Sequence, residues 1–142
     1  MEMTDATDLA RRIADTLLSR EGTGPTWGIK IEDANVGYSR ISMQIRDDML
    51  NGHRIAHGGM IFALADTAFA YACNSRNVST VAQSANIVFL SPGKSGARLT
   101  AEAKEKTLEG RTGVYDITVR GEDGRTVAEF QGISRAIRGE VI

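Results

Sequence analysis

The sequence feature that most constrains the fold is the apolar run from Met60 to Cys73, MIFALADTAFAYAC, in which Asp66 is the only charged residue. Strong helix formers fill this run, two glycines precede it and the residues NSRN follow it, so we predict a helix from Gly59 to about Asn74. The run is shorter than the roughly 20 residues that span a membrane. A helix that is apolar on nearly all sides must be covered by other elements, and a curved antiparallel sheet wrapped around it achieves this in a chain of this size. We therefore expect an α+β fold in which the sheet embraces this helix.

The segments before and after this helix have the patterns of a surface helix and of strands. Between residues 8 and 20, apolar residues recur every three or four positions, which predicts an amphipathic helix. An extended stretch opens at residues 27–31 and continues after Gly37 through residues 38–49, where apolar and polar residues alternate. After the apolar helix, short turns separate four strand-like segments, at residues 80–90, 97–107, 111–121 and 125–137. Four consecutive strands joined in this way predict an antiparallel meander.

Composition limits the number of domains and the classes of partner. A chain of 142 residues suffices for one domain that buries most of its apolar surface, so we expect a single domain over residues 1–142. Seventeen Lys and Arg against 18 Asp and Glu leave no basic surplus, and we expect neither nucleic acid nor a membrane as partner. Cys73 is the only cysteine, and the first residues lack the order of a signal peptide, which together predict a cytoplasmic protein.

Asp66 is the first candidate for chemistry, because it is the only carboxylate between Asp48 and Glu102. Burial of a lone ionised group costs several kcal/mol unless partners or water reach it. One explanation is structural: Asp66 faces a polar subunit interface or caps a neighbouring loop. The other is functional: Asp66 lies at the wall of a cleft and acts as a general base or a nucleophile.

His57, Gly58 and Gly59 form the second candidate, since the start of a helix presents unpaired backbone N–H groups and a partial positive charge. Such a place stabilises an oxyanion, and a glycine lets a substrate approach the backbone closely. A turn glycine and a loop histidine are equally ordinary explanations. The nearby Asn51 holds a turn or contributes to the same site, and His53 is interpreted as a loop residue.

The remaining candidates are weaker. Cys73 is interpreted as a packing residue, because no histidine or other base lies near it in the sequence. We expect no metal site, because His53 and His57 have no nearby Cys or Glu to complete a set of ligands. The turn at Gly110, Arg111 and Thr112, with Lys94 as a second cation, could hold a phosphate or could be solvated surface charge.

The stretch MLNGHRIAHGGMIFALADTAFAYACNS closely resembles the thioesterases of phenylacetic acid degradation, which are members of the hotdog-fold superfamily. The resemblance continues through IVFLSPG, TGVYDI and the final strand. It implies a long helix wrapped by a curved antiparallel sheet, with subunits paired into dimers that have continuous sheets, and usually into tetramers. It also implies hydrolysis of acyl-coenzyme A thioesters, with phenylacetyl-CoA or a ring-hydroxylated phenylacetyl-CoA as substrate and with no cofactor.

The resemblance also assigns roles to individual residues. The N–H of Gly58 would polarise the thioester carbonyl, Asp66 would serve as base or nucleophile, and His57 and Asn51 would orient the reacting groups. The coenzyme A nucleotide would lie near Gly110, Arg111 and Thr112, and the pantetheine channel would be lined by Ala82, Gln83 and Ser84.

Two further points stay open from the sequence. Gly58 and Asp66 are eight residues apart, which is about 12 Å along one helix, so we hypothesise that each active site takes Gly58 from one subunit and Asp66 from its partner. The alternative functions are an acyl-thioester hydratase or dehydratase, and a noncatalytic module that binds acyl-CoA.

Overall fold

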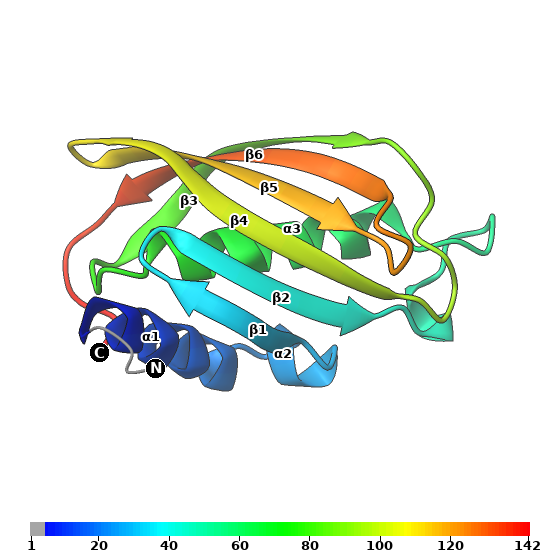
Figure 1. The fold of residues 1–142 in the computed structure, drawn as a ribbon, viewed down its shortest axis with the longest axis horizontal. Helices are drawn as coiled ribbons and strands as arrows, with labels where there is room; N and C mark the ends of the chain where they lie inside the picture. Colours follow the sequence, from blue (N-terminus) through cyan, green and yellow to red (C-terminus); the bar gives the residue numbers. More distant parts are fainter. Residues whose placement is uncertain (1–4) are drawn as a thin grey trace.

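The computed structural model describes residues 5–142, and these residues form one six-stranded antiparallel sheet that curves around a long helix (Figure 1). Residues 1–4, which belong to the expected domain 1–142 and to the segment inspected for a signal peptide, lie outside the described residues. The helices are α1 (Asp5–Arg20), the short α2 (Thr23–Thr26) and the central α3 (Gly58–Cys73), with a 3-10 helix, η1, at Asp47–Met49. The predicted surface helix and apolar helix are both confirmed, each with slightly different ends.

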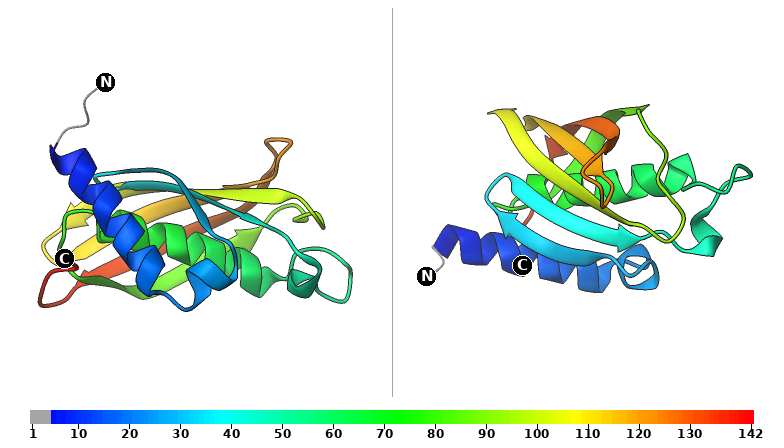
Figure 2. Two further views of the ribbon diagram at one scale, coloured as in Figure 1. Left: turned by 90° about the horizontal axis from the view of Figure 1, so that it is seen from below. Right: turned by 45° about the vertical axis from the view of Figure 1, so that its right-hand side comes forward.

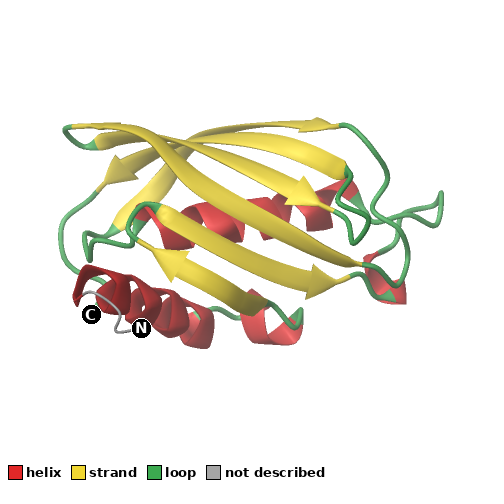
Figure 3. Cartoon of the chain, viewed as in Figure 1, coloured by secondary structure: helices red, strands yellow, loops and turns green. Residues whose placement is uncertain are grey.

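The strands form a single layer (Figure 3). They are β1 (Lys30–Asn35), β2 (Tyr38–Gln44), β3 (Thr80–Phe89), β4 (Arg98–Glu109), β5 (Thr112–Arg120) and β6 (Thr126–Ala136). Their order across the sheet is β1-β2-β4-β5-β6-β3, and every neighbouring pair is antiparallel.

Helix α3 lies on the concave side of the sheet, and its apolar residues explain why it is held there. Leu64, Ala65, Ala68, Phe69 and Ala72 are buried and belong to the same core as the inward residues of the strands. Small residues at three of these positions let the helix approach the strands closely. The hydroxyl of Ser39, on β2, also donates a hydrogen bond of 2.7 Å to the carbonyl oxygen of Ala68.

The opposite face of α3 is only partly covered. Phe62 is exposed, while Ala63, Asp66, Thr67 and Ala70 retain partial exposure. Helix α1 packs along β1 and contacts α3 through its buried residues, so it covers one flank of the helix (Figure 2). The expectation that other elements cover α3 on most sides is thus met only on the faces toward the sheet and α1.

Two predictions about the strands are wrong. Residues 38–49 do not form one strand, since β2 ends at Gln44 and Asp47–Met49 forms the turn η1. The four later strands are not a meander: β4, β5 and β6 are consecutive neighbours, but β3 pairs with β6 at the far edge of the sheet. The reason is that β2 pairs with β4 along its whole length, which joins two strands with matched buried faces and leaves β3 to the opposite edge.

Strand β3 is therefore an edge strand with one neighbour, and its residues are mostly exposed. The exposed apolar side chains on and just beyond it include Val81, Val88, Phe89 and Leu90. An unpaired edge that carries apolar side chains is suited to pairing with another strand. Among residues 5–142, no helix is long and apolar enough to cross a membrane.

Candidate active site

The start of α3 is built around His57, which is the residue that caps the helix. Its backbone is extended, and its Nδ1 atom accepts a hydrogen bond of 2.9 Å from the N–H of Gly59. The carbonyl oxygen of His57 accepts the N–H groups of Met60 and Ile61. These bonds leave the N–H of Gly58 with no acceptor within residues 5–142, as expected for the first residue of a helix.

Gly58 lines a cavity of about 380 Å³ at this end of the helix. The other walls come from the loop that contains Asn51, from Phe89 at the end of β3, and from the segment that follows this strand. A Cβ atom on Gly58 would lie 3.2 Å from Cζ of Phe89, so the ring of Phe89 approaches the backbone there. An unpaired N–H, a positive helix end and a cavity thus coincide at Gly58.

Asn51 holds the loop before α3 and borders the same cavity. Its Oδ1 atom accepts the N–H of His53 at 2.9 Å, and its own N–H donates to the carbonyl oxygen of Ile55 at 2.9 Å. The turn-forming interpretation of Asn51 is therefore confirmed. Its Nδ2 atom makes no hydrogen bond within the described chain, so this donor is free to serve a ligand in the cavity. His53 is exposed on the loop.

Asp66 lies two turns further along α3, on the partly covered face. Burial raises the pKa of Asp66, because the ionised carboxylate loses water. Within residues 5–142 the carboxylate makes no hydrogen bond and no ion pair, so it does not cap a neighbouring loop of its own chain. A raised pKa without a stabilising partner is typical of a group that takes up a proton.

Gly58 and Asp66 do not meet within one chain. Both belong to α3, and eight residues at a rise of 1.5 Å separate them by about 12 Å. Asp66 is absent from the walls of the cavity that contains Gly58. A thioester needs its carbonyl oxygen near the donor and its carbon within roughly 3 to 3.5 Å of the attacking group, so one helix cannot supply both.

The structure separates the residues considered for the coenzyme A part of a substrate. Ala82, Gln83 and Ser84 lie together on the exposed β3, where the pairing with β6 is irregular. Gly110 and Arg111 form the turn between β4 and β5, with Gly110 at φ +59°, and Thr112 begins β5.

Lys94 lies at the opposite end of β4 from this turn, in the segment between β3 and β4. Twelve residues of strand correspond to about 40 Å. The idea that Lys94 assists Gly110, Arg111 and Thr112 in binding one phosphate is therefore wrong within a single chain, because the extended strand β4 lies between them.

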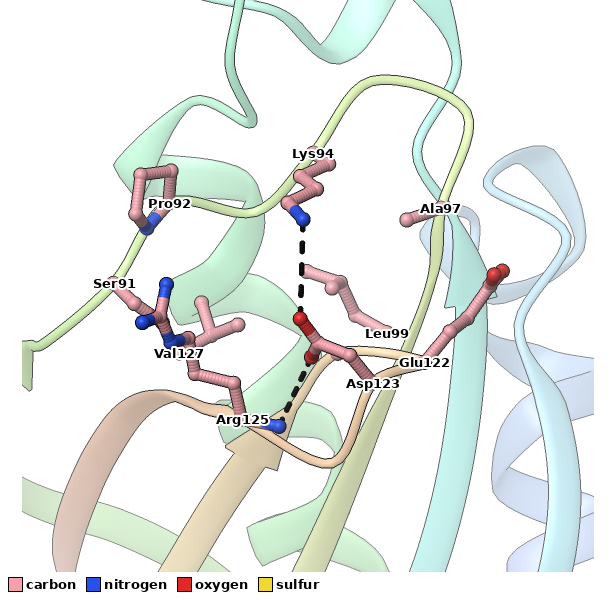
Figure 4. A pocket seen from close by; sticks show the side chains of 10 residues that line it. Ser91, Pro92, Lys94, Ala97, Leu99, Glu122, Asp123, Arg125 and Val127 are labelled. Atoms are coloured by element: carbon pink, nitrogen blue, oxygen red, sulfur yellow. Dashed lines mark hydrogen bonds and ion pairs between the residues drawn. The ribbon is translucent and has the colours of Figure 1, made fainter.

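Lys94 instead borders a second cavity, of about 250 Å³, beside the turn between β5 and β6 (Figure 4). Its Nζ atom lies 3.8 Å from Oδ2 of Asp123, and Oδ1 of the same residue accepts the N–H of Arg125. Figure 4 shows the lysine and the aspartate facing each other across this cavity, so the negative charge of Asp123 offsets the positive charge of Lys94.

Two other groups complete the search for reactive side chains. Cys73 is buried, and burial raises the pKa of its thiol to about 12, which keeps it protonated and agrees with a packing role. No group of three or more His, Cys, Asp or Glu side chains in the described part of the chain is arranged to hold a metal ion.

Residues 53–128 match the family described as the thioesterase superfamily. The chain belongs to this superfamily. It is 41% identical over 128 residues to the acyl-coenzyme A thioesterase PaaI of Escherichia coli, which covers 90% of this chain and 91% of that protein. It is 30% identical to a putative esterase of Archaeoglobus fulgidus, over 87% of this chain and 80% of that protein.

Solved structures agree with this membership. The structure of the E. coli PaaI protein superposes with a TM-score of 0.94 at 40% identity and covers 96% of this chain and 99% of that one. A mutant of the phenylacetic acid degradation protein PaaI from Thermus thermophilus superposes with a TM-score of 0.79 at 36% identity, over 82% of this chain and 100% of that one. The expected family and the hotdog fold are confirmed.

Two contacts of α3 in this superfamily member have no signal in the sequence. Phe89 follows a strand pattern in the sequence, and nothing there indicates that its ring covers Gly58. Glu21 follows α1, and its Oε1 atom accepts a hydrogen bond of 2.5 Å from the hydroxyl of Tyr71 on α3. A charged residue at the end of a surface helix reads as solvated, so only the tertiary structure reveals this contact.

Proposed function

We propose that this protein hydrolyses acyl-CoA thioesters and that phenylacetyl-CoA or a ring-hydroxylated phenylacetyl-CoA is its preferred substrate. The observation that carries the proposal is that α3 holds two polar groups without a partner among residues 5–142. One is the N–H of Gly58, which borders a cavity, and the other is the carboxylate of Asp66, the pKa of which is raised by burial. Membership of the thioesterase superfamily and the likeness to a protein named as an acyl-CoA thioesterase support the same activity. A neighbour from Streptococcus mutans, 25% identical, is described as bound to acetyl CoA.

Gly58 is proposed to act on the carbonyl oxygen. Attack on a thioester places negative charge on this oxygen, and an N–H at the positive end of a helix stabilises that charge. A preorganised donor of this kind is worth roughly 3 to 4 kcal/mol in the transition state. His57 keeps the donor available, because its Nδ1 atom engages Gly59 and its backbone caps the next turn. Asn51 would orient the substrate or the attacking water through its free amide.

Asp66 is proposed to activate the attacking group. In one route it takes a proton from water as the water oxygen bonds to the thioester carbon; the carbon–sulfur bond then breaks, and coenzyme A leaves as a thiolate that becomes protonated. In the other route the carboxylate bonds to the carbon directly, the carbon–sulfur bond breaks and coenzyme A leaves as a thiolate that becomes protonated; water then hydrolyses the resulting anhydride to the free acid and the Asp66 carboxylate. Both routes need an ionised Asp66, and neither needs a cofactor.

We further propose that two subunits build each site, with Gly58 from one and Asp66 from its partner. The separation of about 12 Å on α3 supports this arrangement, and the open, apolar edge of β3 supplies a surface for pairing. A twofold axis that joins two β3 strands would make one continuous sheet. We also propose that dimers associate into a tetramer and that the protein is cytoplasmic.

The activity is tested by measuring release of free thiol from a panel of acyl-CoA thioesters. We expect hydrolysis by the wild-type protein and a loss of at least about a hundredfold in kcat for Asp66→Asn, which is nearly isosteric. Binding of acyl-CoA without thiol release would favour a noncatalytic module, and addition of water across an acyl double bond would favour a hydratase.

The shared site is tested by mixing two inactive variants, Asp66→Ala and Gly58→Pro. Proline removes the donor N–H and is tolerated at the first position of a helix. A mixed dimer regains one complete pair of Gly58 and Asp66, so we expect partial recovery of hydrolysis. Verified mixed dimers without recovery, from parents that remain folded, would exclude the shared arrangement.

A further inference from the structure

A third cavity, of about 380 Å³, lies on the flank of α3 that leads away from Asp66. Its walls come from the end of α1, the second half of α3, the start of β3 and the last residues of the chain. The side chains that the argument uses are Leu17, Glu21, Ala70, Tyr71 and Val81. The volume is within the range of pockets that bind small organic groups.

This cavity begins close to Asp66. Ala70, which lines it, follows Asp66 by one helical turn, so the two Cβ atoms are about 6 Å apart on the same face. Glu21 is also near enough to respond to Asp66: burial is the main cause that raises the pKa of Glu21, and the charge of Asp66 raises it further. A group bonded to a thioester carbon at Asp66 therefore has a short path into the cavity.

The cavity has an apolar wall and a polar wall, which suits an apolar group that carries a polar substituent. Leu17, Ala70 and Val81 are apolar, and the ring of Tyr71 adds an aromatic surface. The other walls are polar and come from Arg20, Glu21, Asn74, Ser79, Thr80 and Glu140. Among these, Glu21 contacts the aromatic side chain of Tyr71, beside Ala70. Its Oε1 atom accepts the hydroxyl of Tyr71, whereas its Oε2 atom has only a long contact of 3.5 Å from the hydroxyl of Thr23. One carboxylate oxygen thus remains able to accept a strong hydrogen bond.

We propose that this cavity binds the acyl group of the substrate and that Glu21 accepts a hydrogen bond from a hydroxyl group on an aromatic acyl ring. The inference rests on the proposed thioesterase activity and assigns the residues that select the acyl group. The cavity at Gly58 of the partner subunit then receives the thioester from the other side. Glu21 is a specificity residue in this scheme and takes no part in bond cleavage.

The first experiment fills the cavity with Ala70→Leu. We compare kcat/KM for phenylacetyl-CoA with that for acetyl-CoA, whose acyl group is too small to need the cavity. The ratio should fall about tenfold relative to the wild type, mainly through KM for phenylacetyl-CoA. An unchanged ratio in a folded variant overturns the assignment of the cavity.

The second experiment compares 4-hydroxyphenylacetyl-CoA with phenylacetyl-CoA in Glu21→Ala, Glu21→Gln and the exposed control Glu129→Ala. Loss of the acceptor should lower the ratio of kcat/KM for the hydroxylated to the plain substrate about tenfold in Glu21→Ala. Glu21→Gln keeps one acceptor oxygen and should restore part of the ratio, and Glu129→Ala should match the wild type.

The outcomes separate this inference from the proposed function. If the wild type releases no thiol from any thioester, the proposed function fails. If the wild type is active and the ratio for the hydroxylated substrate is the same in all three variants, the role of Glu21 is overturned. Because Glu21→Gln is nearly isosteric, it decides the question even if Glu21→Ala does not fold.

Discussion

The contact between Gly132 and Phe69 fixes how closely α3 lies against the sheet, and it yields a quantitative prediction. Gly132 is on β6, and a Cβ atom there would lie 2.5, 2.7 and 2.7 Å from three ring atoms of Phe69. Ordinary carbon contacts are about 3.5 to 4.0 Å, so Gly132→Ala requires the ring to move by about 1 Å. The ring is 1% exposed and packs against Tyr115 and Phe130 at centroid distances of 5.4 and 6.0 Å, which leaves it little room.

The expected cost follows from these contacts. Overpacking a core typically costs about 1 to 3 kcal/mol, and three contacts this short with a buried ring place Gly132→Ala near the upper end. Alanine recovers about 0.5 to 1 kcal/mol relative to glycine through its smaller loss of conformational freedom. We expect a net loss of about 2 kcal/mol in the free energy of unfolding, or a fall of roughly 6 °C in Tm for a chain of this size.

The effect should also reach the proposed active site. Phe69 is one turn after Asp66 on α3, so a ring pushed off the sheet moves the segment that carries the carboxylate. Misplacement of a reacting group by about 1 Å can cost a hundredfold in rate. We therefore expect kcat of Gly132→Ala to fall as well, at temperatures where the variant is fully folded.

The assay is chemical and thermal denaturation at a fixed protein concentration, because the proposed dimer would make the apparent stability depend on concentration. The control is Gly22→Ala, where a Cβ atom meets nothing within 4 Å and the backbone is already helical. Adding Phe69→Leu to Gly132→Ala should recover part of the lost stability, and the double-mutant cycle measures the coupling. A Gly132→Ala protein as stable as the wild type, or one not rescued by Phe69→Leu, would refute the steric argument.

Three further predictions concern Asp66 and the substrate. Because burial raises the pKa of Asp66 and the proposed mechanism needs its ionised form, the acid limb of the kcat profile should lie at a higher pH than that of an ordinary aspartate, and a limb at the ordinary position would contradict this. The same burial lowers the free energy of unfolding when Asp66 is ionised. This destabilisation is present above the pKa of Asp66 in the folded protein, and it is absent below its pKa in the unfolded chain. Asp66→Asn should therefore have a higher Tm than the wild type at neutral pH, and thermal scans should show this gain vanishing on acidification. Among substrates, kcat/KM for phenylacetyl-CoA should exceed that for palmitoyl-CoA, because the cavity of about 380 Å³ beside α3 is too small for a long chain; the opposite order would contradict the assignment.

Local sequence patterns predict where some of the candidate site residues lie, but not which distant residues they contact. Gly58 at a helix start and Asp66 as the lone charge of an apolar helix follow from the sequence, because helix signals depend on residues only a few positions apart. The ring of Phe89 over Gly58 and the bond between Glu21 and Tyr71 join segments that are 31 and 50 residues apart in the chain. No local pattern encodes such contacts.

The sequence by itself determined α1, α3, the strand character of residues 80–137 and the family, since periods of 2 and 3.6 residues and a long motif are visible without coordinates. Only the tertiary structure decided the order of the strands. Alternation tells which face of β3 is apolar but not which neighbour it has, and pairing of β2 with β4 moved β3 to the edge. By contrast, the separation of Lys94 from Gly110 and the distance of about 12 Å between Gly58 and Asp66 follow from chain order along one strand and one helix. Strand order and side-chain convergence are set by the free energy of the whole core, which no single segment contains.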